Sequence, residues 1–142
     1  MRILDVVKAK GEDVVTIAGD ASVKELLDLL AQYKIGAVVV SGGDRSVDGI
    51  VSERDVVRHL QSTGASVLEK PVSTIMTTDV RTCAPEAELG ELEQTMTDHR
   101  IRHVPVVQEG KLFAIVSIGD VVKNRIATLQ AERDQLVEYI QQ

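Results

Sequence analysis

The stretch IVSERDVV at Ile50–Val57 returns almost unchanged as IVSIGDVV at Ile115–Val122, so the two copies begin 65 positions apart. Each copy has an apolar β-branched pair, a Ser, two variable residues, an Asp and a pair of Val residues. The Ser and the Asp keep their spacing while the residues between them change. We infer that the Ser and the Asp share a local role that the variable pair does not.

The repetition extends well upstream of this phrase. A shift of 66 positions aligns Val14–Val40 with Val80–Val106. Identical aligned pairs include Thr16 with Thr82, Glu25 with Glu91, Leu26 with Leu92, and Ile35 with Ile101. A chain that repeats itself at a fixed period is built from copies of one structural unit. The sequence therefore predicts a tandem duplication.

Both copies predict the same order of strand, helix, strand, strand and helix. Apolar residues at helical spacing predict the helices, and short β-branched runs predict the strands. The segment VSTIM at 72–76 is similar to ILDVV at 3–7, so we interpret it as the opening of the second copy and not as a linker. The predicted strands cover residues 14–18, 35–40 and 49–52, then 80–84, 102–107 and 112–117; the predicted helices cover 23–33 and 53–61, then 88–100 and 119–126.

This order predicts an α/β (α+β) fold of two β-α-β-β-α repeats. We place the first repeat at residues 1–65, the second at 66–126 and a C-terminal helical extension at 127–142. A single half of this size buries too little apolar surface to fold well alone. We therefore expect the two repeats to pack against each other with pseudo-twofold symmetry.

Composition narrows the classes of function. A formal net charge of −6 and a pI near 5.0 disfavour binding to duplex nucleic acid, and 2% aromatic residues disfavour single-stranded binding. Cys83 is the sole cysteine, which excludes an intrachain disulfide and favours a reducing compartment. No apolar run approaches the length of a membrane span, and the charged N-terminus is unlike a signal peptide. We expect a cytoplasmic protein that binds neither nucleic acid nor a membrane.

The Ser-x-x-Asp pattern has two interpretations that do not exclude each other. In the first, the Ser caps a helix and the Asp three positions later completes a capping box. In the second, the same helix start binds a ligand, because its unpaired N–H groups and positive dipole end attract phosphate. A carboxylate one turn into the helix can also accept hydrogen bonds from ribose hydroxyls.

A cluster of basic residues supports the second interpretation. The stretch DHRIRHVPV at Asp98–Val106 places four His and Arg residues within five positions of an otherwise acidic chain. His99 and Arg100 suit the C-terminus of a helix, where cations complement the dipole. Arg102 and His103 enter a predicted strand, so we expect them to face an anionic ligand.

At these residues the chain resembles the CBS-domain family, in the form of the tandem pair called a Bateman module. The family signature follows a strand–helix–strand unit and reads Gly, two apolar residues, Ser or Thr, any two residues, and Asp. Gly49–Asp55 carries it intact, whereas Ala114–Asp120 begins with Ala in place of Gly. The resemblance covers about residues 1–125 and is greatest to the short free-standing CBS-pair proteins.

The resemblance implies an adenine nucleotide bound in the cleft between the repeats, with AMP preferred and ADP, ATP or NAD(H) as alternatives. By motif position, Asp55 and Asp120 would hold ribose hydroxyls, while Ser52 and Ser117 would contact ribose or phosphate. Of the two sites, we expect the one at Asp120 to bind the nucleotide better.

The remaining site residues follow from the same resemblance. Arg54, Arg100 and Arg102 would meet the phosphates, and Lys34 holds the position equivalent to Arg100. Arg54 could also reach the second site across the cleft. The adenine pocket would be lined by Thr16, Gly36, Ala37, Val38, Thr82, His103, Val104 and Pro105.

These expectations amount to a regulatory module that is not an enzyme and that signals to an unknown target protein by changing conformation. Two alternatives stay open: a structural or interaction module without a ligand, and a binder of S-adenosylmethionine. An enzyme acting on nucleotides is disfavoured, because the sequence offers no independent general base or metal cluster. Apolar residues recur along Val121–Gln142 in a short heptad pattern, which predicts a terminal helix. That helix either packs on its own repeat or forms the contact of the homodimer that the resemblance implies.

Overall fold

The first repeat folds into a three-stranded sheet in the order β1-β2-β3, with β1 parallel and β3 antiparallel to the central β2. The computed structural model describes residues 1–11 and 14–141. The β-branched run of β2 is buried on both faces, which is why it reads as a continuous apolar segment. The elements of this repeat are β1 (Thr16–Ile17), α2 (Val23–Tyr33), β2 (Ala37–Val40), β3 (Gly49–Ser52) and α3 (Glu53–Thr63).

The second repeat has the same order with one strand reduced. The antiparallel pair β4–β5 matches β2–β3, whereas the strand predicted at 80–84 is reduced to one parallel bridge between Cys83 and Val106. That bridge is equivalent to the β1 pairing of Ile17 with Val40, so the topology is kept although the strand is not. The elements are α4 (Leu89–His99), β4 (His103–Gln108), β5 (Lys111–Ser117) and α5 (Ile118–Gln141).

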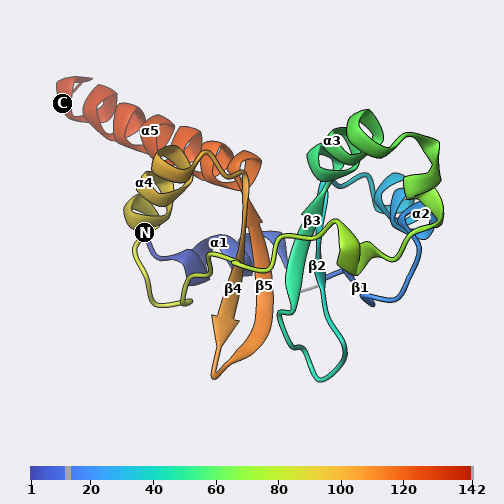
Figure 1. Ribbon diagram of the computed structural model, residues 1–142. Coiled ribbons are helices and arrows are strands. Elements are labelled where there is room, and N and C mark those ends of the chain that lie inside the picture. The colour runs from blue at the N-terminus through green and yellow to red at the C-terminus, as the bar shows by residue number, and fades with distance from the viewer. Residues whose placement is uncertain (12–13, 142) are drawn as a thin grey trace.

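Figure 1 shows the two sheets next to each other at the centre of the molecule, with α2 and α3 on one flank and α4 and α5 on the other. The prediction of two α/β repeats with an extended C-terminal helix is confirmed. In place of the predicted strand at 14–18, the structure has only the two residues of β1.

The opening segments of the two repeats are exchanged. Helix α1 (Ile3–Lys10) precedes the first repeat in sequence, but it packs into the core of the second together with Leu92 and Val104. The 3₁₀ turns η1 (Ala65–Glu69) and η2 (Val72–Thr74) pack instead against the core of the first repeat. The helical form of α1 was not predicted from the sequence.

Matching hydrogen bonds relate the two exchanged segments. The Val72 N–H donates to the Ala21 carbonyl over 2.8 Å, and the Ile3 N–H donates to the Ala87 carbonyl over 2.9 Å. Ala21 and Ala87 are an aligned pair in the duplication. The likeness between residues 3–7 and 72–76 therefore corresponds to a shared structural role, with each segment serving the other repeat.

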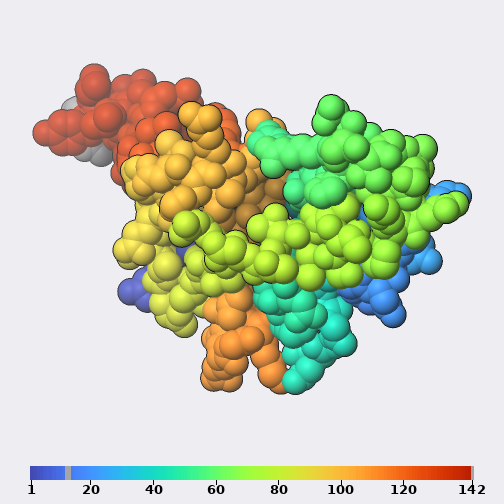
Figure 2. Space-filling view, viewed as in Figure 1, coloured from blue at the N-terminus to red at the C-terminus, as the bar shows by residue number. Residues whose placement is uncertain are grey.

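The repeats also touch at the tips of their hairpins. The Leu112 N–H donates to the Arg45 carbonyl over 2.8 Å, and the Lys111 ammonium lies 3.0 Å from an Asp44 carboxylate oxygen. In Figure 2 the two hairpin tips stand side by side on the lower edge of the molecule. These contacts and the exchanged segments tie the repeats into one body.

The departure of the second copy from the family signature has a structural reason. A Cβ at Gly49 would lie 2.6 Å from the Met76 sulfur and 2.9 Å from the Thr77 carbonyl oxygen. Thr77 comes this close because its backbone exchanges two hydrogen bonds with Ile50, each 2.9 Å long. No such bridge forms at Ala114 within the part of the chain that the structure describes, so that position accepts a methyl group.

Candidate functional site

The first Ser-x-x-Asp phrase forms the start of α3. The Asp55 Oδ2 accepts hydrogen bonds from the Ser52 N–H over 2.8 Å and from the Ser52 hydroxyl over 3.1 Å. The Asp55 N–H donates back to the Ser52 Oγ over 3.4 Å, which completes a capping box. The capping interpretation is therefore confirmed for this copy.

The second phrase caps α5 in the same way and adds a partner. The Asp120 Oδ2 accepts from the Ser117 N–H over 2.9 Å, and the Asp120 N–H donates to the Ser117 Oγ over 3.2 Å. The same carboxylate oxygen lies 2.6 Å from the ammonium of Lys10, at the end of α1. Lys10 also donates to the Ile115 carbonyl over 2.8 Å.

The electrostatics of this second site differ from those of the first. Burial alone would raise the pKa of the Asp120 carboxyl, but the hydrogen bonds from Lys10 and Ser117 and the Lys10 charge hold it below its usual value. The side chains of Lys10 and Asp120 are 32% and 21% exposed, so water screens this ion pair only in part. Asp55 has no cationic partner among the residues that the structure describes.

Each capping carboxylate keeps one oxygen for other contacts. In both Asp55 and Asp120 the hydrogen bonds go to Oδ2, and Oδ1 accepts none from residues 1–11 and 14–141. The side chains of Ser52, Asp55 and Asp120 are partly buried at the helix starts. Capping and ligand binding therefore do not compete for the same oxygen.

His103 lies where the two repeats meet. It pairs with Ser117 across β4 and β5, while its ring reaches the first repeat. A Cβ at Gly36 would lie 3.7 Å from the His103 Cε1 and 3.8 Å from the Glu53 carboxyl carbon. Burial and the Lys10 charge hold the pKa of His103 below its usual value, against the opposite effect of Asp120 and Glu53. This shift favours the neutral imidazole at pH 7.

The predicted phosphate ligands lie on the surface around these helix starts. Lys34 ends α2 and Arg100 ends α4, both in the left-handed conformation with φ of 54° and 53°. The two cations therefore occupy equivalent C-cap positions in the backbone. Arg54 and Arg102 are exposed, and no guanidinium of these three arginines has an ion-pair partner in the described chain.

The loops before β2 and β4 are held against the helix starts. The Glu53 N–H donates to the Gly36 carbonyl over 3.0 Å, and the Ile118 N–H donates to the Arg102 carbonyl over 2.8 Å. These equivalent bonds bring Gly36 and Arg102 next to the first turns of α3 and α5. The strand residues predicted to line the adenine pocket follow directly in both repeats, and most are buried: Ala37, Val38, Val104 and Pro105.

Two hollows lie beside elements of the first repeat, and only one of them is next to the start of α3. One, of about 500 Å³, is lined by apolar residues of α2 together with Lys34, Gly36 and Glu53, beside the start of α3. Its volume lies within the range of small-molecule sites. The other, of about 270 Å³, contains Thr16 and Leu112 and lies at the hairpin tips. Thr16 therefore lines a different hollow from Lys34 and Gly36, although it pairs with Val39 next to Val38, and Thr82 is exposed beside Cys83.

Three further features of the described residues concern thiol chemistry, metal binding and membrane spans. Burial raises the pKa of the Cys83 thiol to about 11, as suits a partly buried packing residue. No group of three His, Cys, Asp or Glu side chains in this part of the chain is placed to hold a metal ion. No helix among these residues is long and apolar enough to cross a membrane.

Sequence reasoning missed Lys10. This residue belongs to the opening segment of the first repeat, so nothing in the repeat pattern links it to Asp120, 110 positions away. The similarity of residues 3–7 to 72–76 was the available signal, but it reveals the exchange only when the hydrogen bonds of both segments are known.

Comparison with known proteins gives a consistent result for both copies. The sequence model of the CBS domain matches twice, over residues 6–62 and 72–127. The mitochondrial CBS domain-containing protein CBSX3 of Arabidopsis thaliana is 35% identical, and the alignment covers 98% of this chain and 71% of that protein. An inosine-5′-monophosphate dehydrogenase of Aquifex aeolicus is 38% identical over 78% of this chain, which spans only 22% of that enzyme.

Solved structures share the fold. The CBS-domain containing protein ATU1752 from Agrobacterium tumefaciens is 44% identical with a TM-score of 0.85, covering 88% of this chain and 99% of that one. The CBS domain pair of protein MJ0100, crystallised with 5′-methylthioadenosine and S-adenosyl-L-methionine, has a TM-score of 0.80 over 90% of this chain and 98% of that one. At 19% identity, the second likeness shows the fold alone.

Proposed function

The chain belongs to the CBS-domain family and carries two CBS domains in tandem, and on this basis we propose that it is a regulatory module that binds an adenine nucleotide. AMP is the preferred ligand of this proposal, and ADP, ATP and NAD(H) are the alternatives. The module has no catalytic role in this proposal. Binding alters how the two repeats pack, and a partner protein responds to the difference. A ligand can shift such a balance only by its differential affinity for the two arrangements.

The observation that carries the proposal is the pair of unused carboxylate oxygens at the two helix starts. Asp55 and Asp120 each keep Oδ1 without a hydrogen bond from the described residues, while Oδ2 completes the cap. A ribose offers two adjacent hydroxyl donors, and a carboxylate held rigidly at a helix start accepts them without reorganisation. The capping hydrogen bonds therefore hold each carboxylate in place to accept the ribose hydroxyls.

Charge near the helix starts suits the phosphate. The exposed guanidinium groups of Arg100 and Arg102 and the ammonium of Lys34 flank the predicted sites without ion-pair partners in the described chain. A guanidinium can bind a phosphate through two parallel hydrogen bonds. Beside Lys34, the apolar residues of α2 and Ile35 line the hollow and supply apolar walls for a purine.

One relative supports an adenosine ligand without identifying it. The MJ0100 domain pair binds 5′-methylthioadenosine and S-adenosyl-L-methionine, so one protein of this fold takes adenosine compounds. The similarity to inosine-5′-monophosphate dehydrogenase covers a small part of that enzyme, so a segment like this chain also occurs within a larger protein. We carry the adenosine class to this chain and leave S-adenosylmethionine as the rival ligand.

Isothermal titration with AMP, ADP, ATP, NADH and S-adenosylmethionine tests the proposal. We expect saturable binding of AMP, which Asp120→Ala weakens by tenfold or more while the protein stays folded. A protein without a ligand site would give no heat with any of the five compounds. Mass spectrometry of small molecules released from the purified, denatured protein gives an independent identification.

The same proposal includes a homodimer formed through α5. Every residue from 131 to 141 on this helix is exposed, including Leu136, Val137 and Ile140. Figure 1 shows this half of α5 projecting away from the body of the molecule. A helical segment as short as residues 131–141 is marginally stable in water when nothing packs against it. We therefore propose that a second copy of the chain covers the apolar residues of this segment.

Charge favours an antiparallel arrangement of the two α5 helices. Lys123 and Arg125 outnumber Asp120 in the first half of the helix, while Glu132, Asp134 and Glu138 outnumber Arg133 in the second half. Antiparallel pairing sets each half against its opposite charge, and a twofold axis generates this pairing from identical chains. We expect a dimer in sedimentation velocity, which Leu136→Glu dissociates and Gln135→Glu, with the same change of charge, does not. A wild-type monomer at about 100 µM would refute this part of the proposal.

Two predictions from the sequence are kept as part of the proposal. The boundaries at 1–65, 66–126 and 127–142 divide the duplication by sequence, although the exchanged opening segments cross the first of them in space. The cytoplasmic location stays a prediction, to be checked by fractionation of the native organism.

A further inference from the structure

Lys10 reaches the second site from outside the repeat that forms it. Its ammonium lies 2.6 Å from the Asp120 Oδ2 and donates to the Ile115 carbonyl over 2.8 Å. Ile115 pairs with Pro105 in the β4–β5 ladder, but the Pro105 carbonyl accepts from Cys83 on the other side of β4, so this is a non-hydrogen-bonded pair and the Ile115 carbonyl points away from β4. The lysine therefore satisfies an acceptor on β5 and the capping carboxylate of α5 at the same time.

The contacts of Lys10 leave it able to bind something more. An ammonium has three N–H donors, and the described contacts use two of them. Its side chain is 32% exposed, so the third donor has access to solvent at the start of α5. This helix start is also where unpaired backbone N–H groups favour an anion.

We propose that Lys10 is a ligand-selecting residue of the Asp120 site, which makes that site specific for phosphorylated adenosine compounds over neutral or cationic ones. This inference rests on the proposed nucleotide-binding function. A ribose takes Oδ1 of Asp120, the lysine stays near Oδ2, and the phosphate meets the third ammonium donor.

The charges around the site explain the direction of the selection. Without Lys10, the Asp120 carboxylate and Glu53, both of which act on the His103 ring, would repel a phosphate and attract a sulfonium cation. With Lys10 in place, the Asp120 charge is compensated and one cation faces the ligand. Arg102 acts in the same direction from the loop before β4.

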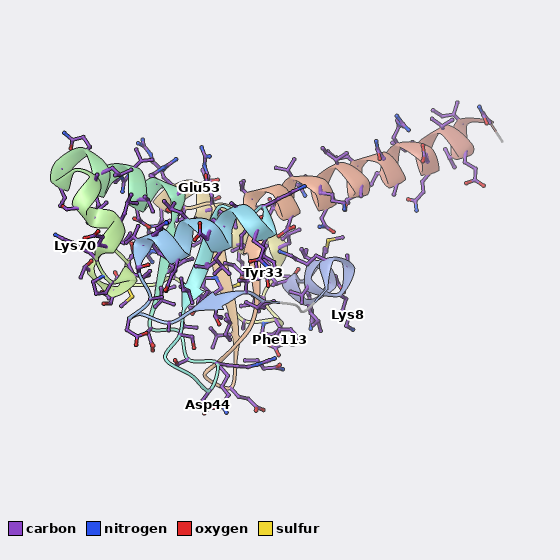
Figure 3. The ribbon with its side chains drawn as sticks, turned by 90° about the vertical axis from the view of Figure 1, so that its right-hand side faces the viewer. Lys8, Tyr33, Asp44, Glu53, Lys70 and Phe113 are labelled. Atoms are coloured by element: carbon purple, nitrogen blue, oxygen red, sulfur yellow. The ribbon has the colours of Figure 1, made fainter. Side chains whose placement is uncertain are left out.

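The test compares ligands in a background where only the second site can respond. Titrations use AMP, adenosine and S-adenosylmethionine with Asp55→Asn protein and with the same protein carrying Lys10→Met. Lys8→Met is the matched control, because Lys8 is exposed on the same helix and makes no ion pair or side-chain hydrogen bond in the described chain. Figure 3 shows Lys8 on the side of α1 turned away from α5.

We expect Lys10→Met to weaken AMP binding about tenfold and to strengthen S-adenosylmethionine binding about fivefold, as the loss of one partly screened charge allows. Lys8→Met leaves both affinities unchanged, and Lys10→Arg restores the preference for AMP, which also shows that position 10 tolerates substitution. An unchanged ratio of AMP to S-adenosylmethionine affinity in Lys10→Met would overturn the inference and leave the proposed function intact.

Two further outcomes separate the inference from the proposed function. If wild-type protein binds AMP but the Asp55→Asn protein does not, the nucleotide occupies the first site. This result would refute the role of Lys10 and leave the proposed function intact. If wild-type protein binds none of the three compounds, the proposed function fails and the inference fails with it.

Discussion

The ion pair between Lys10 and Asp120 allows a quantitative prediction from two matched substitutions. Asp120→Asn and Asp55→Asn each remove one carboxylate charge from the first turn of a helix and retain an amide oxygen that can accept the capping hydrogen bond. Only Asp120 has a lysine 2.6 Å away. The difference between the two variants therefore isolates the ion pair.

The magnitude follows from the exposure of the pair. Fully exposed ion pairs contribute about 0.2–1 kcal/mol, and hydrogen bonds to charged groups about 1.5–3 kcal/mol. With side chains 32% and 21% exposed, the pair should contribute about 1–2 kcal/mol. We expect Asp120→Asn to lower the free energy of unfolding by that amount more than Asp55→Asn, or about 3–6 °C in Tm.

The direction in which pH changes this stability follows from the pKa of Asp120. The pKa of Asp120 in the folded protein lies below its ordinary value of 3.8, so the unfolded chain binds this proton first as the pH falls. The extra stability is fully present above about pH 5 and is lost as the pH falls through the folded pKa. Urea denaturation followed by circular dichroism between pH 3 and pH 7 measures it. Equal effects of the two substitutions, or a difference that does not decrease between pH 5 and pH 3, would refute this reasoning.

Three further substitutions or reactions test other parts of the structure. Gly49→Ala places a methyl group 2.6 Å from the Met76 sulfur and should lower the free energy of unfolding by about 1–3 kcal/mol. Its control, Gly90→Ala, adds a methyl group in open space on α4 and should raise the free energy of unfolding by about 0.5–1 kcal/mol in the same denaturation assay. The pKa of His103 is lower in the folded protein than in the unfolded chain, so the unfolded chain binds this proton first as the pH falls. The free energy of unfolding should therefore decline below about pH 6.5, and His103→Gln should remove that decline. With a pKa of about 11 in place of 9.0, Cys83 should react with a disulfide reagent at pH 8 about 100-fold more slowly in the native than in the unfolded protein; equal rates would contradict its burial.

Most of the fold could be predicted because local signals agree with the duplication. Helix α2 begins where Ser22 caps it, with its N–H and hydroxyl bonded to Glu25, and it follows the apolar spacing read from the sequence. The strands β2, β3, β4 and β5 lie on the β-branched runs. Where only two residues pair, as in β1, or one, as at Cys83, the apolar pattern overestimates the strand, because pairing there depends on the neighbouring strand.

The exchanged segments could not be predicted from local signals. Helix α1 has three buried residues, Ile3, Val6 and Val7, whose spacing suits a helix, but the sequence does not say which core they enter. That choice depends on how the two repeats pack. The Lys10–Asp120 contact depends on it in turn, so it stayed hidden although Asp120 itself was assigned from the sequence.

The exchange also explains why two copies of one unit have unequal sites. In the first repeat, the backbone of Thr77 bonds both the N–H and the carbonyl of Ile50, so moving that segment breaks two backbone hydrogen bonds and disturbs the contact at Gly49. In the second repeat, a lysine side chain binds the equivalent carbonyl of Ile115. A lysine side chain can adjust its rotamer without moving the backbone, so the contact at Ile115 is more adaptable than the two backbone hydrogen bonds at Ile50. Because α1 ends at Lys10 and packs into the second core, the Lys10 side chain links the Asp120 carboxylate at the start of α5 to the end of α1.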